Sequence, residues 1–328
     1  MKIGKVSQTV LKRSVLGQLN TCYHSNFPPL RVEEMCGILE VDERRQVFFT
    51  DACCYGNEKN LGVFVIAKTI NDLASRGAEP QGITVNIQLP PHAYESRLKS
   101  MTEQMACICE AHKLQVLSAK AEVNPVIKSA IVQVTAIGTA KPDQVWRSSN
   151  GKPEQDILLI NWIGLEGMLR ILNEKEEELG QRFASTFLQS MKRGINHLFA
   201  VEEIQCAQQL GASVIQQISG GGILAALWEM AEASHVGLEI DLNKIAIKQE
   251  TIEVCECFQM NPYQLTSTGC ALVFMDDGER FIHQMKERKK QAVWIGRTTK
   301  SKERVILKGA DKRFIDRPQP DELAKIYM

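Results

Sequence analysis

A glycine turn is the clearest chemical feature of this sequence. It reads Ser219-Gly220-Gly221-Gly222 and follows an apolar segment, 212–218, that predicts a strand. Apolar residues recur at helical spacing from Ile223 onward, so a helix should begin just after the turn. Glycines let backbone N–H groups approach a ligand closely, and a helix N-terminus carries partial positive charge. The turn therefore predicts an anion site, usually for phosphate, with a ligand-free tight turn as the alternative.

Two aspartates are the candidate metal ligands. Asp51 is expected at the end of a strand, and Asp72, beside Asn71, on an otherwise apolar helix over 61–77. A carboxylate on such a helix costs free energy unless it is paired or binds a cation. Mg²⁺ prefers carboxylates together with phosphate oxygens, so this pair predicts a Mg²⁺ site. A capping or salt-bridged aspartate is the alternative for Asp72, and Glu122 is a weaker candidate.

Other chemical signatures are missing from the sequence or ambiguous in it. It contains no GxxxxGK[ST] phosphate loop, no GxGxxG fingerprint and no GxSxG elbow, and its six histidines lack ligand spacing. Ten cysteines fit thiols kept reduced inside a cell. Two Cys-x-Cys pairs, at 107 and 255, fall on predicted helices, where such neighbours point about 200° apart. Buried thiols are therefore expected, with a thiol or metal function at Cys36 or Cys53-Cys54 as the alternative.

Composition bounds the class of protein. The chain has 328 residues, 44% of them hydrophobic, and a formal net charge of zero. This length predicts two domains, and the charge gives no reason to expect nucleic acid or an anionic membrane as a partner. The basic stretch 286–317 is expected to be a solvated face, with phosphate or nucleic-acid binding as the alternative. The sequence lacks a bilayer-length apolar run and a secretory signal, so we expect a cytoplasmic protein.

Hydrophobic patterning divides the chain into two α/β units, 1–145 and 155–328, joined by a polar, turn-rich linker. In the first unit we expect strands over 47–50, 82–89, 116–119 and 130–137, and helices over 61–77 and 95–112. In the second we expect strands over 157–162, 212–218, 236–240, 271–275, 292–295 and 304–307, and helices after 164 and 222 and over 183–194, 202–210 and 249–260.

Several motifs in order give the chain a family resemblance. It resembles the aminoimidazole ribonucleotide synthetase superfamily, and within it the hydrogenase maturation factor branch, over nearly its whole length. No single motif is decisive, but their order is specific. The matching segments are 71–80 (NDLASRGAEP), 164–167 (GLEG), 219–233 (the glycine turn with ALWEMAEA), 237–240 (GLEI), 295–297 and 304–307.

The resemblance implies an N-terminal mixed-sheet domain, a C-terminal α/β sandwich and a homodimer built through the N-terminal domains. It implies ATP in a cleft near the dimer interface, held through Mg²⁺ by Asp51 and Asp72. The other residues it assigns to the nucleotide are Asn71, Lys120, Glu122, Ser219, Gly220, Gly221 and Gly222. The chemistry implied is phosphoryl transfer to an amide-like oxygen, which becomes a leaving group; such transfer depends on positioning and cations.

Departures from the family pattern leave two functions open. Met35, Lys120 and Gln217 stand where the family has acidic residues. A lysine 4 Å from a cation is repelled by about 4 kcal/mol per unit charge at an effective dielectric near 20, yet it could contact a phosphate directly. The branch also carries its transferred group on a C-terminal cysteine, whereas the last cysteine here is Cys270. The alternatives are an ATP-dependent enzyme and a non-catalytic, dimeric nucleotide- or phosphometabolite-binding protein.

Overall fold

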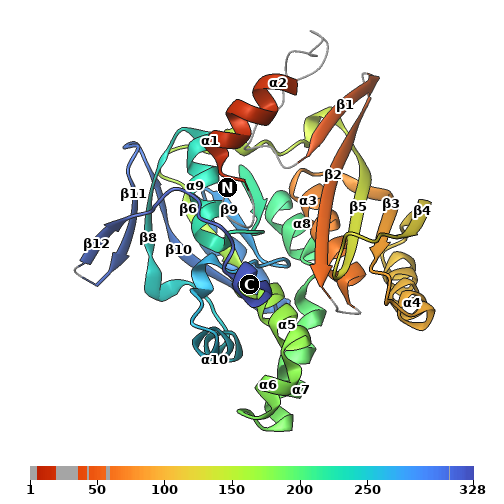
Figure 1. The fold of residues 1–328 in the computed structure, drawn as a ribbon. Coiled ribbons are helices and arrows are strands. Elements are labelled where there is room, and N and C mark those ends of the chain that lie inside the picture. The colour runs from red at the N-terminus through yellow and green to blue at the C-terminus, as the bar shows by residue number, and fades with distance from the viewer. Residues whose placement is uncertain (1–5, 20–35, 43, 57–59, 310) are drawn as a thin grey trace.

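A computed structural model describes residues 6–19, 36–42, 44–56, 60–309 and 311–328. It contains two sheets that lie side by side, one in each half of the chain (Figure 1). Within the described residues, none of the helices combines the length and apolarity needed to cross a membrane. The two-domain α/β architecture is the one expected.

The N-terminal domain is a five-stranded mixed sheet in the order β1-β2-β5-β3-β4. Only β3 and β4 pair in parallel, and α4 makes the crossover between them. This follows a general rule, because parallel neighbours need a long connection. The elements are β1 (Gly37–Asp42), β2 (Arg45–Gly56), α3 (Leu61–Ser75), β3 (Glu79–Leu89), α4 (Glu95–Ala111), β4 (Gln115–Val123) and β5 (Ala130–Ala140).

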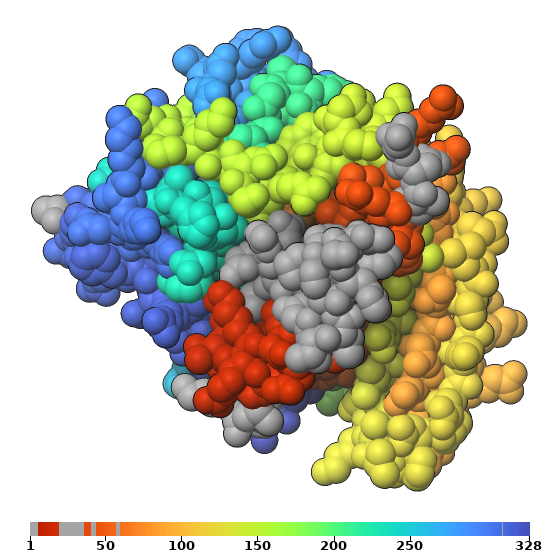
Figure 2. Space-filling view, turned by 90° about the horizontal axis from the view of Figure 1, so that it is seen from above, coloured from red at the N-terminus to blue at the C-terminus, as the bar shows by residue number. Residues whose placement is uncertain are grey.

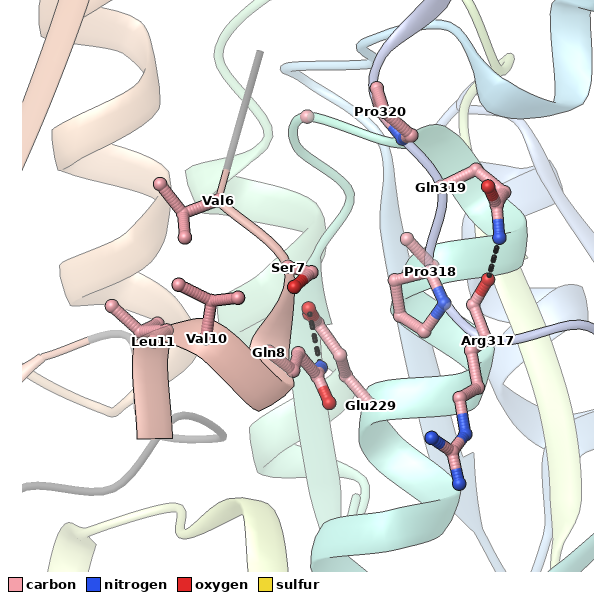
Figure 3. Close-up of a pocket in the computed structure, with 12 residues that line it drawn as sticks. Val6, Ser7, Gln8, Val10, Leu11, Glu229, Arg317, Pro318, Gln319 and Pro320 are labelled. Carbon is pink, nitrogen blue, oxygen red and sulfur yellow. Dashed lines mark hydrogen bonds between the residues drawn. The ribbon is translucent and has the colours of Figure 1, made fainter. Parts of the chain in front are cut away.

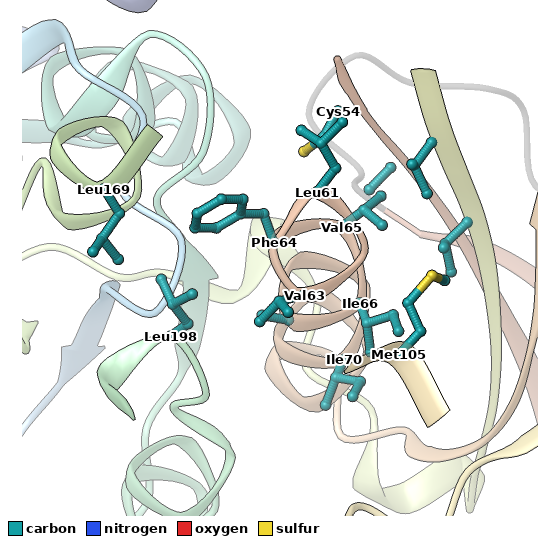
Figure 4. Close-up of a cluster of buried hydrophobic side chains, with 14 of the residues drawn as sticks. Cys54, Leu61, Val63, Phe64, Val65, Ile66, Ile70, Met105, Leu169 and Leu198 are labelled. Carbon is teal, nitrogen blue, oxygen red and sulfur yellow. The ribbon is translucent and has the colours of Figure 1, made fainter. Parts of the chain in front are cut away.

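Helix α3 is the wall between the two domains. Nearly every residue from Leu61 to Ser75 is buried, which is why its sequence is apolar around almost its whole circumference. Figure 4 shows Ile66 and Ile70 directed toward the N-terminal sheet, while Phe64 points toward Leu169 and Leu198 of the C-terminal half. Polar groups on α3 are therefore enclosed between two layers.

The C-terminal domain is a seven-stranded mixed sheet in the order β12-β11-β8-β10-β6-β9-β7. Helix α9 packs on one face, and α8 and α11 pack on the other. Central strands such as β6 are buried on both faces, so they read as continuous apolar runs. The strands are β6 (Asp156–Ile160), β7 (Val214–Gln217), β8 (Gly237–Asp241), β9 (Ala271–Met275), β10 (Ala292–Thr299), β11 (Arg304–Lys308) and β12 (Asp311–Phe314).

The helices of this domain carry the connections. The α-helices are α5 (Leu165–Glu174), α6 (Glu176–Gly180), α7 (Ser185–Lys192), α8 (Val201–Gln209), α9 (Gly222–Ser234), α10 (Gln249–Cys257) and α11 (Gly278–Glu287). The 3₁₀ turns are η3 (Pro142–Gln144), η4 (Ser148–Asn150), η5 (Arg193–His197), η6 (Leu242–Lys244), η7 (Pro262–Gln264) and η8 (Glu322–Tyr327).

The N-terminal segment and residues 317–320 border one cavity beside α9. An N-terminal helical segment, formed by α1 (Gln8–Leu11), the π-helical η1 (Lys12–Leu16) and α2 (Gly17–Leu19), lies against the C-terminal half in the space-filling view (Figure 2). The Gln8 side-chain amide donates to the Glu229 carboxylate on α9 at 3.2 Å. The segment 317–328 runs past the same helix start.

Several described elements were not anticipated, among them β1, β12 and α11, and several strands are longer than expected. Strand β2 continues five residues past Asp51. Strand β4 continues past Ala119 to Val123. It is an edge strand whose side chains are all exposed, so its sequence has no apolar alternation that would predict its length. Strands β1 and β12 are likewise short edge strands. Helix α11 carried a readable signal, since the Asp277 side chain caps it and Phe281 and Met285 recur at helical spacing.

Candidate functional site

A buried amide–carboxylate network joins α3 to the end of β7. The Gln217 side-chain Nε2 donates to Asp72 Oδ1 at 2.6 Å and to the Lys68 carbonyl at 3.0 Å. Asn71 Nδ2 donates to Gln217 Oε1 at 2.9 Å, and Asn71 Oδ1 accepts from the Ala200 N–H at 3.0 Å. Gln217 and Asn71 are fully buried and Asp72 is 3% exposed, so the network fixes the two domains relative to each other.

The Asp72 carboxylate is held in a low-dielectric position. Burial raises its pKa to about 6, although nearby Lys68 and the hydrogen bond from Gln217 pull the pKa down. The Thr50 hydroxyl also donates to Asp72 Oδ2, at 3.4 Å. Burial lowers the pKa of Lys68, but Glu166, Cys54 and Asp72 outweigh that effect and raise it overall.

A second cluster of charges lies on α5, beside Lys68. Arg170 forms a buried ion pair with Glu166 at 3.4 Å and donates to the Tyr55 carbonyl at 3.0 Å. Burial would raise the pKa of Glu166, but Lys68 and Arg170 with the Thr266 hydroxyl, at 2.6 Å, lower it overall. The interface between the domains therefore carries two cations, Lys68 and Arg170, close to two carboxylates.

The glycine turn has the predicted form. Strand β7 ends at Gln217, the turn closes with the Gly222 N–H donating to the Ser219 carbonyl at 3.0 Å, and α9 begins at Gly222. Gly221 and Gly222 have φ of 88° and 67°, and a Cβ on Gly222 would lie 2.4 Å from the Tyr263 carbonyl oxygen. Both the backbone conformation and the close approach thus require glycine.

The chain itself supplies an anion to this turn. Asp321 Oδ2 accepts the Gly221 N–H at 2.7 Å, and its Oδ1 accepts the Leu323 N–H at 2.9 Å. Burial raises the pKa of Asp321, and the two hydrogen bonds partly offset that rise. The anion at the turn is thus a carboxylate of the chain itself, 100 residues further along, and the binding of a ligand phosphate there stays a prediction.

A cavity of about 390 Å³ lies next to the turn (Figure 3). Of the predicted site residues only Gly220 lines it. Its walls are the N-terminal segment, the start of α9 and the segment 317–320, and the Glu229 carboxylate reaches it from α9. The volume falls in the range of small-molecule sites. The lining residues are Val6, Ser7, Gln8, Val10, Leu11, Gly220, Ala225, Glu229, Arg317, Pro318, Gln319 and Pro320.

The structure places Asp51 apart from Asp72. Asp51 lies within β2, where the Thr135 hydroxyl of β5 donates to it on the open face of the sheet. The preceding residue, Thr50, faces α3 and contacts Asp72. Because successive strand residues point to opposite faces, the two carboxylates lie on opposite sides of the N-terminal sheet. This corrects the expectation that both aspartates of one chain hold the same ion.

Lys120 and Glu122 lie on the same open face as Asp51. The register pairs Lys120 with Asn86 and Glu122 with Gln88, both outward-facing residues of β3. Lys120 is exposed, so it does not reach the glycine turn or Asp72. The predicted residues thus form two groups: Asp51, Lys120 and Glu122 on the open sheet face, and Asn71, Asp72 and residues 219–222 at the domain interface. Met35 lies outside the described residues.

The donor set at Asp72 does not fit Mg²⁺. Gln217 turns a positive N–H dipole toward the carboxylate, at the position where a cation would bind, and Lys68 adds a full charge nearby. Mg²⁺ requires several oxygen ligands around it. In the part of the chain that the structure describes, no three side chains of His, Cys, Asp or Glu come together to hold a metal.

Sequence reasoning missed four residues of this region: Lys68, Glu166, Arg170 and Asp321. Lys68 lies one turn before Asp72 on α3, and Arg170 one turn after Glu166 on α5, so the helical spacing was a readable signal. Asp321 carries no local signal toward the glycine turn. The nine described cysteines are free thiols, and Cys36, Cys54, Cys109, Cys206, Cys255 and Cys270 are buried.

Comparisons with known proteins agree with this architecture. The chain matches the models of AIR synthase related protein, N-terminal domain, over residues 33–140 and C-terminal domain over 157–308. A putative hydrogenase expression/formation protein of Methanocaldococcus jannaschii is 22% identical over 98% of this chain and 97% of its own length.

Solved structures give the same likeness at the level of the fold. HypE from a HypE–HypF complex superimposes with a TM-score of 0.74 at 20% identity, covering 93% of this chain and 100% of that one. HypE in complex with ATP gives a TM-score of 0.67 at 13% identity, covering 98% and 97%. With both domain models matched in order, the chain belongs to the AIR synthase related family and is similar to the HypE hydrogenase maturation proteins within it.

Proposed function

We propose that this protein binds ATP at the domain interface and uses it in HypE-type chemistry, the transfer of a phosphoryl group to an amide-like oxygen. The observation that carries the proposal is the glycine turn at the start of α9, where the Gly221 N–H group donates to the Asp321 carboxylate, and which follows Gln217, the residue that joins β7 to α3. The full-length likeness to a HypE structure in complex with ATP supports the nucleotide.

The residues of this chain suit a triphosphate in two ways. The backbone N–H group of Gly221 lies at a helix N-terminus, where negative charge is stabilised. Lys68 lies near enough to Asp321 to lower its pKa, so its positive charge acts in the low-dielectric region beside the turn. In the transfer, the bond from the γ-phosphorus to the β,γ-bridging oxygen breaks, ADP leaves, and a bond to the acceptor oxygen forms.

A second function has a specific observation in its favour. Gln217 stands where the family has an acidic residue, and its side-chain amide donates a hydrogen bond to Asp72 at 2.6 Å. That carboxylate is therefore not available to bind a metal ion. Because the residues around Asp72 do not fit Mg²⁺, the ion has no role in the phosphoryl transfer described above. A dimeric protein that binds a nucleotide or phosphometabolite without Mg²⁺–ATP chemistry is the alternative function.

We further propose a homodimer formed through the open face of the N-terminal sheet. Phe49 pairs with Ile137 on this face, and both apolar side chains are only half-buried within the described residues. HypE of the HypE–HypF complex shares the fold of this chain, and we propose that this protein likewise binds a HypF-like partner.

We also propose that the protein acts in the cytoplasm, which follows from its proposed HypE-like role.

Calorimetry with ATP tests the proposal and separates the two functions. We expect ATP to bind, and ADP to be released when an amide acceptor such as carbamoyl phosphate or a peptidyl carboxamide is added. Binding that is equal in Mg²⁺ and in EDTA, without ADP release above that of Asp72→Asn, would favour the non-catalytic function. The matched control is Asp316→Asn, which changes an exposed carboxylate. Absence of ATP binding in both buffers would refute both nucleotide functions.

A further inference from the structure

The segment 317–328 touches both domains. Its Asp321 carboxylate caps the Gly221 N–H at 2.7 Å. Its far end reaches the N-terminal domain, where the Tyr327 hydroxyl donates to the Tyr55 carbonyl at 3.2 Å and the two rings meet edge to face at 5.0 Å. Leu323 and Ala324 are buried between these contacts. The segment therefore bridges the two domains across the charged interface.

The same segment borders the cavity beside the glycine turn. Arg317 to Pro320 form one wall, and Figure 3 shows Pro318 and Pro320 opposite the N-terminal segment. Asp321 follows directly, so its carboxylate lies where the cavity meets the turn. A ligand that entered the cavity and reached for the Gly221 N–H would meet Asp321 first.

We propose that residues 317–328 are a displaceable strap, and that the Asp321 carboxylate holds the place of a ligand phosphate at the glycine turn until a phosphorylated ligand displaces it. The proposal rests on the nucleotide function above and adds its regulation. Two anions cannot share one N–H donor at hydrogen-bond distance, because like charges that close repel strongly in a half-buried site. Phosphate binding and the closed strap therefore exclude each other.

The construction of the strap suits displacement. Residues Glu322–Tyr327 of the strap form a 3₁₀ helix, whose hydrogen-bond geometry is poorer than that of an α-helix. Lys325 and Met328 are exposed, and Lys325 reaches only the Gln259 carbonyl at 3.2 Å and the adjacent Glu322. No strand of either sheet depends on the segment for pairing. It can leave without breaking a sheet.

Binding of AMPPNP to the full chain tests the strap by calorimetry. We expect Asp321→Ala to bind AMPPNP about tenfold more tightly than the unmodified protein, since the competing carboxylate is gone, and to bind adenosine unchanged. Asp316→Ala, an exposed aspartate just before the strap, is the matched control and should bind AMPPNP with the affinity of the unmodified protein.

Hydrogen exchange on the unmodified protein gives a second readout that needs no variant. Amides of 321–327 should exchange faster when AMPPNP is saturating, while those of α3 should not. Equal AMPPNP affinity in Asp321→Ala and unmodified protein, with unchanged exchange in the segment, would overturn the strap and leave nucleotide binding standing. If neither protein binds AMPPNP, the nucleotide function fails and the strap fails with it.

Discussion

Replacing Asp72 by Asn should flatten the dependence of stability on pH. Asp72 is buried between α3, β2 and β7, and burial raises its pKa from the ordinary value of 3.8 to about 6. The folded protein therefore holds the Asp72 proton more tightly than the unfolded chain does. Asn has the same shape and cannot titrate, so the variant lacks this contribution.

The sign and size follow from linkage. Between pH 3.8 and 6 the folded state keeps a proton that the unfolded state has released, so the free energy of unfolding falls as pH rises through this window and levels off above it. The difference between the two pKa values corresponds to about 3 kcal/mol, of which about 2 kcal/mol lies between pH 4.5 and 7.5. Ionised Asp72 thus costs stability at neutral pH, and Gln217 limits that cost.

Urea unfolding at a series of pH values measures the effect. The quantity to compare is the unfolding free energy of the unmodified protein minus that of Asp72→Asn, because other carboxylates cancel in the difference. We expect this quantity to be larger at pH 4.5 than at pH 7.5 by about 2 kcal/mol. Asp316→Asn should show no such change. A difference that is constant with pH, or that rises with pH, would refute the burial argument.

Three further changes follow from the same structure. Gln217→Asp should make the melting temperature rise on adding Mg²⁺, because it turns a donor beside Asp72 into a second carboxylate; calorimetric scans with and without EDTA decide this. Gly222→Ala should destabilise the fold by about 3 kcal/mol in urea unfolding, whereas Gly180→Ala, with open space around its Cβ, should change it little. Phe49→Asp should convert a dimer to monomers in light scattering, and an unchanged mass would exclude the open sheet face as the interface.

Much of the fold follows from local patterns. Helix α3 and strands β6 and β9 are apolar on every side, and each is buried on every side in the structure. Helix α4 carries its apolar residues on one stripe and buries only that stripe, at Met101, Met105 and Cys109. Edge strands were harder, because β4 exposes all its side chains and its sequence therefore lacks the alternation that marks a half-buried strand.

The site was less predictable than the fold, because its geometry depends on register. Thr50 and Asp51 are adjacent in sequence, yet one faces Asp72 and the other faces away from it. Which of two neighbouring residues faces a helix is decided by the strand register, and a shift of one residue would exchange them. The glycine turn, in contrast, was predictable, since its chemistry is local: positive φ at two successive glycines and the start of a helix.

Two side chains of this protein lie where a bound ligand would be expected, one beside Asp72 and one at the glycine turn. Gln217 presents an N–H dipole to Asp72 as a cation would, and Asp321 presents a carboxylate to Gly221 as a phosphate would. They differ in how they are held. Gln217 is the fully buried last residue of β7 and also binds Asn71, so removing it would break the side-chain hydrogen bonds between β7 and α3. Asp321 precedes a short 3₁₀ helix that takes no part in either sheet, so we propose that its place can be vacated. Under the strap proposal, the cation position stays closed while the phosphate position can open, and the glycine turn would then take a phosphorylated ligand without a bound metal.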